Sequence, residues 1–179
     1  HPLDPLSASE ISKAVARFRQ EHGKKAFFSS IGLVEPPKAK VKAGEPAPRV
    51  ARLLGMDKQP DGGFVADINI DSEEITISRL AGDSQSPYGF VDLGLATMLT
   101  KQNEEWREAV AKRGVPCTTD EELELIQIDP WPAGGYAHPA IPKGHRALRC
   151  LAFVREDETD NGYAKPIHGL IAHVDVTDS

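Results

Sequence analysis

The pattern that most limits the fold is an order of elements that occurs twice along the chain: a helix, then several strands. In the first half, Ser7 and Glu10 form an S-x-x-E capping box, and apolar residues recur at helical spacing up to Gly23. We therefore predict a helix over residues 7–22. The runs that follow are rich in Val, Ile and Phe or alternate apolar with polar residues, which predicts antiparallel strands at 26–34, 49–56, 64–70 and 74–80.

Turn and loop signals separate these strands. Asp61-Gly62-Gly63 is typical of a hairpin turn, and it does not fit a phosphate-binding loop because it does not open a helix. A polar segment lies between the first two strands, and in it Lys38, Lys40 and Lys42 alternate along an expected sheet edge. Lysines without aromatic residues between them are typical of a protected edge or a solvated face, which we favour over a polyanion site.

The second half repeats this order after a linker-like stretch at 82–89, which is rich in Gly, Ser and Pro. Helical spacing and alternation predict, in turn, helices at 90–99 and 103–113 and strands at 122–131, 146–155 and 167–176. We therefore predict an α+β fold with two tandem domains, residues 1–86 and 87–179, each with a helix packed on an antiparallel sheet.

The acidic balance of the chain excludes several classes of partner. Lys and Arg number 21 against 27 Asp and Glu, and the net charge of −6 argues against phosphate-backbone binding, which depends on clustered cations. No apolar run reaches the ~18 residues of a membrane span, and residues 1–5 lack the pattern of a signal peptide. We expect a soluble chain with no nucleic-acid or membrane partner, and we leave its compartment open, with secretion and the periplasm among the alternatives.

No catalytic, cofactor-binding or metal-ligating residue is predicted. His168 and His173 are five residues apart in a predicted strand, which places their side chains on opposite faces. His138 and His145 share a loop and can meet only if that loop folds back. A G-x-S-x-G nucleophile elbow is absent, and neither cysteine lies in a recognisable Cys/His pattern. We interpret all six histidines as surface or hydrogen-bonded structural residues: His1, His22, His138, His145, His168 and His173.

Two further features have alternative interpretations, and a third has one. Cys117 and Cys150 either form one disulfide, if their Cα atoms lie within about 7 Å, or remain two buried thiols. The acidic clusters at 120–122 and 156–158 flank predicted strands, so we favour solvated turns over paired acids or calcium ligands. Trp131 lies at the start of a loop rich in Pro and Gly, where we expect it to pack against a neighbouring domain.

Several segments of the chain form an ordered set. In the first half they are residues 1–7, Glu35-Pro36-Pro37-Lys38, the G-x-x-x-P-R stretch from Gly44 to Arg49, and Ala66-Asp67-Ile68-Asn69-Ile70. In the second half they are Arg149-Cys150-Leu151-Ala152-Phe153-Val154 and Tyr163-Ala164-Lys165-Pro166-Ile167-His168-Gly169-Leu170. In this order the segments resemble the second and third amino-terminal domains of the copper amine oxidases, the family that includes tyramine and phenylethylamine oxidases.

The resemblance implies two cystatin-like domains and a parent enzyme that oxidises primary amines such as tyramine to aldehyde, ammonia and hydrogen peroxide. In that family the activity belongs to a carboxy-terminal domain. There, three histidines hold copper, two of them as His-x-His, and a tyrosine in Asn-Tyr-Asp or Asn-Tyr-Glu becomes topaquinone. Here Tyr88, Tyr136 and Tyr163 follow Pro or Gly, and no two histidines are two residues apart. Copper and topaquinone are therefore expected only in the parent enzyme's catalytic domain, and no cofactor is expected on this chain.

Three hypotheses about function follow. We favour a non-catalytic structural and interaction module that packs around the catalytic domain of an amine oxidase and helps to shape the approach to its active site. The resemblance implies a homodimer for that parent enzyme. The first alternative is a free-standing cystatin-like subunit that docks on a separate catalytic chain. The second alternative is a small enzyme with a deep polar pocket enclosed by one sheet, which two solid apolar cores would exclude.

Overall fold

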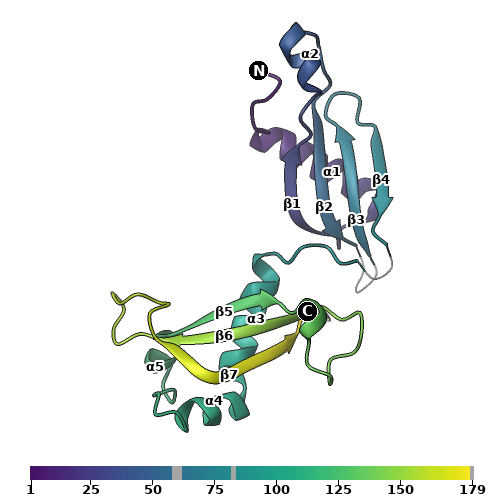
Figure 1. Ribbon diagram of the computed structural model, residues 1–179. Coiled ribbons are helices and arrows are strands. Elements are labelled where there is room, and N and C mark those ends of the chain that lie inside the picture. The colour runs from purple at the N-terminus through teal and green to yellow at the C-terminus, as the bar shows by residue number, and fades with distance from the viewer. Residues whose placement is uncertain (58–61, 82–83, 178–179) are drawn as a thin grey trace. The chain divides into compact units, whose positions relative to one another are not determined.

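The chain folds into helices and two antiparallel sheets, seen in a computed structural model that describes residues 1–57, 62–81 and 84–177 (Figure 1). It divides into two units, His1–Gly89 and Phe90–Ser179, each of which contains one sheet. The predicted α+β class is therefore confirmed. Asp61 of the predicted hairpin turn, and Gly82 and Asp83 of the linker-like stretch, lie outside the described residues.

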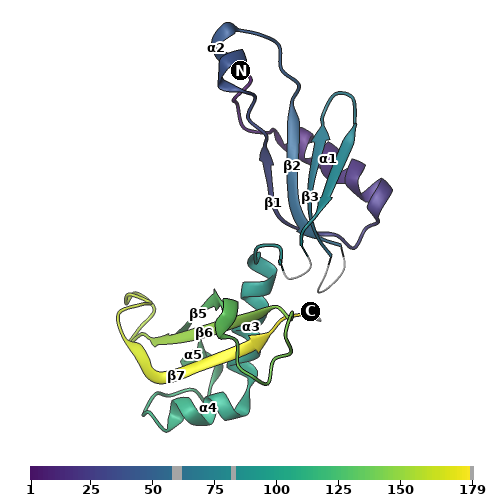
Figure 2. The ribbon, with the colours of Figure 1, turned by 45° about the vertical axis from the view of Figure 1, so that its right-hand side comes forward.

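In the first unit, one long helix covers one face of a four-stranded sheet. The helix α1 (Ala8–His22) begins at the predicted capping box, in which Ser7 Oγ accepts from the Glu10 N–H at 3.2 Å, and it ends at Gly23. It runs behind the strands in Figure 1 and beside them in Figure 2. The strands pair in chain order: β1 (Phe27–Leu33), β2 (Val50–Met56), β3 (Gly63–Asn69) and β4 (Ile75–Arg79).

An aromatic cluster fills the space between α1 and this sheet. Phe18 of α1 stacks on Phe64 of β3 with ring centroids 4.5 Å apart, and its ring meets the edge of Phe28 at 5.4 Å. Full burial of a phenylalanine is worth roughly 1.5–3 kcal/mol, so this cluster holds the helix on the sheet. Small and branched side chains complete the core: Ala14, Ala26, Ala51, Leu53, Ala66, Ile68 and Ile70.

The polar segment between β1 and β2 contains a short helix that the sequence did not predict. This helix, α2 (Lys38–Ala43), follows Pro37 and ends at Gly44, whose φ of 66° suits a residue without a side chain. The prediction that the three lysines alternate along a sheet edge is therefore wrong. None of the six residues is buried, so their placement on a solvated face remains the interpretation that fits.

The second unit packs helices on one face of a three-stranded sheet. The strands β5 (Ile126–Pro132), β6 (Ala147–Val154) and β7 (Pro166–Asp175) pair in chain order. In Figure 1, α3 (Phe90–Gln102) lies behind these strands and α4 (Glu104–Ala111) runs alongside β7. The core of this unit is also apolar: Val110, Leu123, Ile126, Ile128, Leu148, Cys150 and Ala152.

The start of the predicted strand at 122–131 is wrong. A short helix, α5 (Asp120–Glu124), precedes β5. It begins at a second capping box, in which Thr119 Oγ1 accepts from the Glu122 N–H at 3.2 Å and Glu122 Oε2 accepts from the Thr119 N–H at 3.1 Å. This T-x-x-E signal is the same one that identified α1. Leu123 and Leu125 also fit an alternating strand, so the sequence pattern alone predicts a strand there.

The last strand contains a bulge. Its pairing with β6 shifts between Leu151 and Phe153, and within β7 the residue Gly169 has a φ of 67°. Arg113, just after α4, holds this bulge by donating from Nε to the His168 carbonyl at 2.8 Å and from Nη2 to the Gly169 carbonyl at 2.6 Å. None of the helices in the described part of the chain combines the length and apolarity required to cross a membrane.

Candidate functional site

The loop between β5 and β6 is attached to β7 through histidines. The His138 N–H donates to His173 Nδ1 at 3.0 Å, and His145 Nδ1 lies 2.6 Å from Asp175 Oδ2. Burial lowers the pKa of His173, and Arg149 and His138 lower it further, which favours the neutral ring that can accept a hydrogen bond. The two loop histidines therefore meet β7 rather than each other.

Asp175 is the residue of β7 that contacts His145. Burial alone would raise the pKa of its carboxyl, but hydrogen bonds from Thr177 and His145 lower the pKa overall. The carboxylate is thus charged and fully engaged at neutral pH. The prediction that these histidines are hydrogen-bonded structural residues agrees with this geometry.

The residues in the described part of the chain do not fit copper or topaquinone. No three His, Cys, Asp or Glu side chains gather closely enough to hold a metal ion in residues 1–57, 62–81 and 84–177. The sequence predicts that His168 and His173 lie on opposite faces of a regular strand. This prediction from strand spacing does not apply, because the bulge at Gly169 lies between the two histidines. Tyr136 and Tyr163 are exposed, and Tyr163 packs edge-on against Phe153 at 5.3 Å.

Both cysteines are free and buried, which decides between the two alternatives left open by the sequence. The Cys117 thiol lies 3.3 Å from the Arg107 carbonyl, to which it can donate. Burial raises the pKa of the Cys150 thiol, so the reactive thiolate is disfavoured at neutral pH. Neither thiol is placed as a nucleophile.

The two acidic clusters stabilise local structure. Glu122 serves the cap of α5, so the first cluster opens a helix and is not the turn that we predicted. In the second cluster Glu156 pairs with Lys165, and Asp157 accepts two hydrogen bonds from Thr159, which lower the pKa of its carboxyl. The second cluster is an exposed turn, as predicted.

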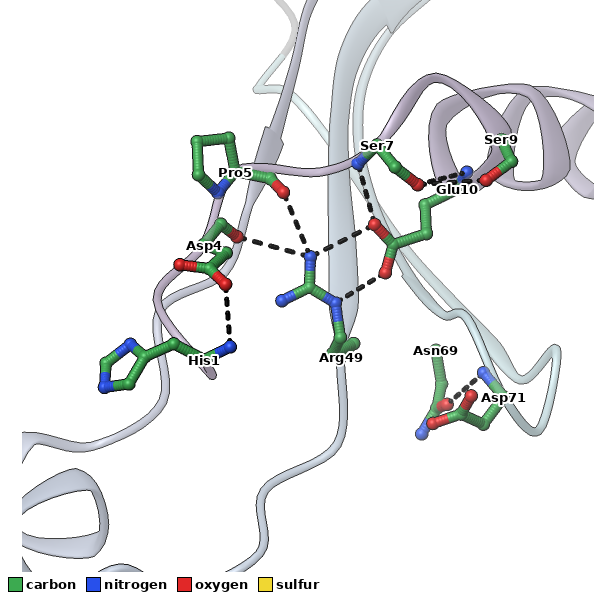
Figure 3. Close-up of polar contacts among 9 residues, drawn as sticks. All are labelled: His1, Asp4, Pro5, Ser7, Ser9, Glu10, Arg49, Asn69 and Asp71. Carbon is green, nitrogen blue, oxygen red and sulfur yellow. Dashed lines mark hydrogen bonds and ion pairs between the residues drawn. The ribbon is translucent and has the colours of Figure 1, made fainter.

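The most connected ion pair of the first unit joins the start of α1 to the start of β2 (Figure 3). Arg49 donates from Nε and Nη2 to the two carboxylate oxygens of Glu10, at 2.5 and 3.1 Å, and from Nη2 to the carbonyls of Asp4 and Pro5 at 3.3 Å. The hydrogen bonds that Glu10 accepts from Arg49 and from the Ser7 N–H lower its pKa to about 2. Every charge is paired, so the geometry anchors the N-terminal segment and offers no general base.

The sequence did not reveal a buried ion pair in the second unit. Arg146 is fully buried, and its Nη2 donates to Asp92 Oδ2 at 2.9 Å, while its backbone N–H donates to Thr177 Oγ1 at 2.8 Å. A buried charge has to be paired, so Asp92 fixes α3 on the sheet. The available signal was the spacing of Asp92, Ala96 and Thr100, which places two polar residues on one helix face.

An open groove of about 490 Å³ lies between α3, α4 and the edge of β7. Leu99, Trp106 and Ile171 contribute its apolar lining, and Glu105 and His173 contribute polar groups. Trp106 is 5% exposed, and its indole N–H has no acceptor among the described residues. Trp131, expected to pack against another domain, is 58% exposed and donates from Nε1 to Asp129 at 2.7 Å.

Two compact α+β units, each with helices packed on one antiparallel sheet, define the class of fold. Residues 1–60 match the copper amine oxidase N2 domain family, and residues 91–179 match the copper amine oxidase N3 domain family. The chain belongs to the copper amine oxidase family and contains its N2 and N3 domains. The resemblance drawn from the sequence is thereby confirmed.

Known relatives agree with this assignment. A primary amine oxidase of Arthrobacter sp. (strain P1) is 30% identical over 98% of this chain and 26% of its own length. The peroxisomal N-methylputrescine oxidase 1 of Nicotiana tabacum is 27% identical over 98% of this chain and 27% of its own length. The crystal structure of a copper-containing benzylamine oxidase from Hansenula polymorpha matches 93% of this chain and 27% of its own, with a TM-score of 0.65. At 16% identity that match shows the fold alone. The chain thus spans about a quarter of the length of these relatives.

Proposed function

We propose that this chain serves as the non-catalytic amino-terminal region of a copper- and topaquinone-dependent primary-amine oxidase. The observation that carries the proposal is the order of the N2 and N3 matches, along a chain that spans about a quarter of its relatives' length. The parent reaction would be the oxidation of primary amines, such as tyramine, to aldehyde, ammonia and hydrogen peroxide. The two domains would pack around the catalytic region and help to shape the approach to its active site.

The residues of this chain support the proposal that catalysis belongs to another region of the enzyme. In the proposed enzyme, copper and topaquinone belong to the catalytic region outside this chain, because here no tyrosine follows an asparagine and no histidines form His-x-His. The ionisable groups described above instead join elements of one unit, as Glu10 and Arg49 do. The proposed partner is the catalytic region of the same or a separate polypeptide, in a homodimeric enzyme.

The first test is an activity measurement. The purified chain, incubated with copper and tyramine, is expected to produce no hydrogen peroxide above the blank, while the full-length oxidase produces it under the same conditions. Turnover of tyramine by the chain alone would contradict the proposal. The intact mass of the native product separates a region of one long polypeptide from a free-standing subunit, which would have the mass of this chain.

A further inference from the structure

Helix α3 exposes several of its large apolar residues, while two of its polar residues, Asp92 and Thr100, are buried. The stripe that faces the sheet consists of Asp92, Ala96 and Thr100, and Thr100 Oγ1 donates back to the Ala96 carbonyl at 2.7 Å. Four large apolar residues of this helix are exposed: Phe90, Val91, Met98 and Leu99, at 92, 66, 46 and 37%. A helix on the surface of a complete protein shows the reverse distribution. The outer face of α3 therefore has the composition of an interface.

A glycine lies in the middle of this outer face. Phe90, Gly94 and Met98 are four residues apart, so they share one side of the helix. Glycine inside a helix is unfavourable relative to alanine. A Cβ added at Gly94 would meet nothing within 4 Å, so packing inside this unit does not require the glycine. A missing side chain on an exposed helix face does allow the backbone of a partner to approach closely.

The apolar face continues into the groove beside α4. Leu99 lines that groove together with Ile171 of β7, which is 43% exposed. We define the α3 surface as the set of residues exposed along this path: Phe90, Val91, Gly94, Met98, Leu99 and Ile171. Exposed apolar residues that gather on one element mark interaction sites more often than isolated exposed residues do.

We propose that the α3 surface is where the second unit docks on the remainder of the amine oxidase polypeptide, an inference that rests on the proposed function. The relatives are about four times as long as this chain, so a large partner surface exists in the proposed enzyme. Residues 90–179 hold 9 Lys and Arg against 15 Asp and Glu, whereas residues 1–89 hold 12 of each. The second unit is therefore acidic overall, and a partner patch that is apolar with a basic rim would complement it, because opposite charges steer such surfaces together.

The methionines provide a direct test. The chain has two, of which Met98 is 46% exposed and Met56 is 3% exposed. Oxidation to the sulfoxide by a low concentration of hydrogen peroxide follows exposure, so Met98 should oxidise about tenfold more slowly in the full-length oxidase than in the isolated chain. Peptide mass spectrometry measures both residues, and Met56 is the internal control that should stay protected in each sample. Equal rates for Met98 in the two samples would overturn the proposal.

The variant Gly94→Ala adds a test in which the isolated chain and the full-length oxidase are expected to respond differently. In the isolated chain the added methyl group favours the helix and should raise Tm by roughly 4–8 °C. In the full-length oxidase it would stand between the docked surfaces, so Met98 should oxidise faster than in the unsubstituted enzyme. Unchanged Met98 protection in that variant would show that no partner approaches the helix there, which also overturns the proposal.

A third test compares aspartate substitutions at two positions whose side chains have similar exposed fractions. Leu3 in the first unit is 42% exposed, close to the value for Met98. We expect Met98→Asp to lower Tm of the full-length oxidase by several degrees more than Leu3→Asp does. Equal shifts would contradict the assignment of the surface.

Failure of this inference is distinguishable from failure of the proposed function. If the isolated chain oxidises tyramine, the proposed function fails whatever the state of Met98. If Met98 in the isolated chain becomes protected as the concentration rises and the chain elutes as a dimer, a second copy covers the surface, and the docking proposal is wrong while the proposed function stands.

Discussion

At the scale of single residues, ionisable side chains of this chain connect separate segments through hydrogen bonds. Glu10 joins α1 to β2 through Arg49, and Arg113 holds the bulge of β7 through two carbonyls. Charge-assisted hydrogen bonds of this kind are stronger than neutral ones. These bonds stabilise the fold, and the lowered pKa of Glu10 has a structural explanation.

The lowered pKa of Glu10 makes a prediction about acid stability. The folded pKa is about 2, against an ordinary value of 4.5. The ionised carboxylate therefore stabilises the fold fully above pH 4.5, and this contribution is lost as the pH falls towards 2. The variant Glu10→Gln should flatten the dependence of the urea midpoint on pH in this window, as measured by circular dichroism.

Two further variants make this test specific. In Arg49→Met the pKa of Glu10, followed by NMR, should rise towards its ordinary value, because Arg49 is the largest cause of the shift. Glu45→Gln, at an exposed position of the same unit, should leave the pH profile unchanged. A Glu10 pKa that stays near 2 without Arg49 would refute the assigned cause.

At the scale of helices and strands, the long helices and most strand positions were predictable, and the short helices were not. Helix α1 and strands β3 and β6 extend over enough residues for one periodicity to dominate. Helices α2 and α5 have six and five residues, so their sequences also fit an edge or a strand. The bulge in β7 and the pairing of Asp92 with Arg146 depend on contacts between residues distant in sequence, which no local pattern encodes.

The buried polar stripe of α3 predicts a large effect for one substitution. Asp92→Ala removes the carboxylate that pairs with Nη2 of the fully buried Arg146, and loss of one member of a buried pair costs about 3 kcal/mol or more. As a control, Glu108→Ala removes an exposed i,i+4 pair with Lys112 and should cost only a few tenths of a kcal/mol. Urea unfolding followed by tryptophan fluorescence measures both. A loss below about 1 kcal/mol for Asp92→Ala would show that this pair does not fix the helix.

At the scale of the whole chain, each unit has its own sheet and apolar core. This arrangement argues against the small-enzyme alternative, because apolar side chains predominate between the helices and each sheet. The boundary that we predicted between residues 86 and 87 stays a prediction about folding, and we propose that the chain folds as two independent domains on either side of this region. The absence of assigned catalytic residues is likewise an expectation that the activity measurement tests.

Separate production of residues 1–89 and 90–179 tests the independence of the two units. Units of about 90 residues bury enough surface to fold alone, so each piece should unfold cooperatively. Both tryptophans, Trp106 and Trp131, lie in the second unit. The fluorescence transition of the whole chain should therefore coincide with that of the piece 90–179. A piece that remains unfolded, or a shifted transition, would show that the units depend on each other.

The irregularity at Gly169 has a consequence for the behaviour of the chain at high concentration. Strand β7 ends the order of its sheet, and an outermost strand is a template on which other chains can add and grow into fibres. The bend at Gly169 limits the regular part of this template to the six residues 170–175, a length at the lower limit for such stacking. The bulge should therefore slow amyloid-like growth of the second unit when no partner covers the α3 surface.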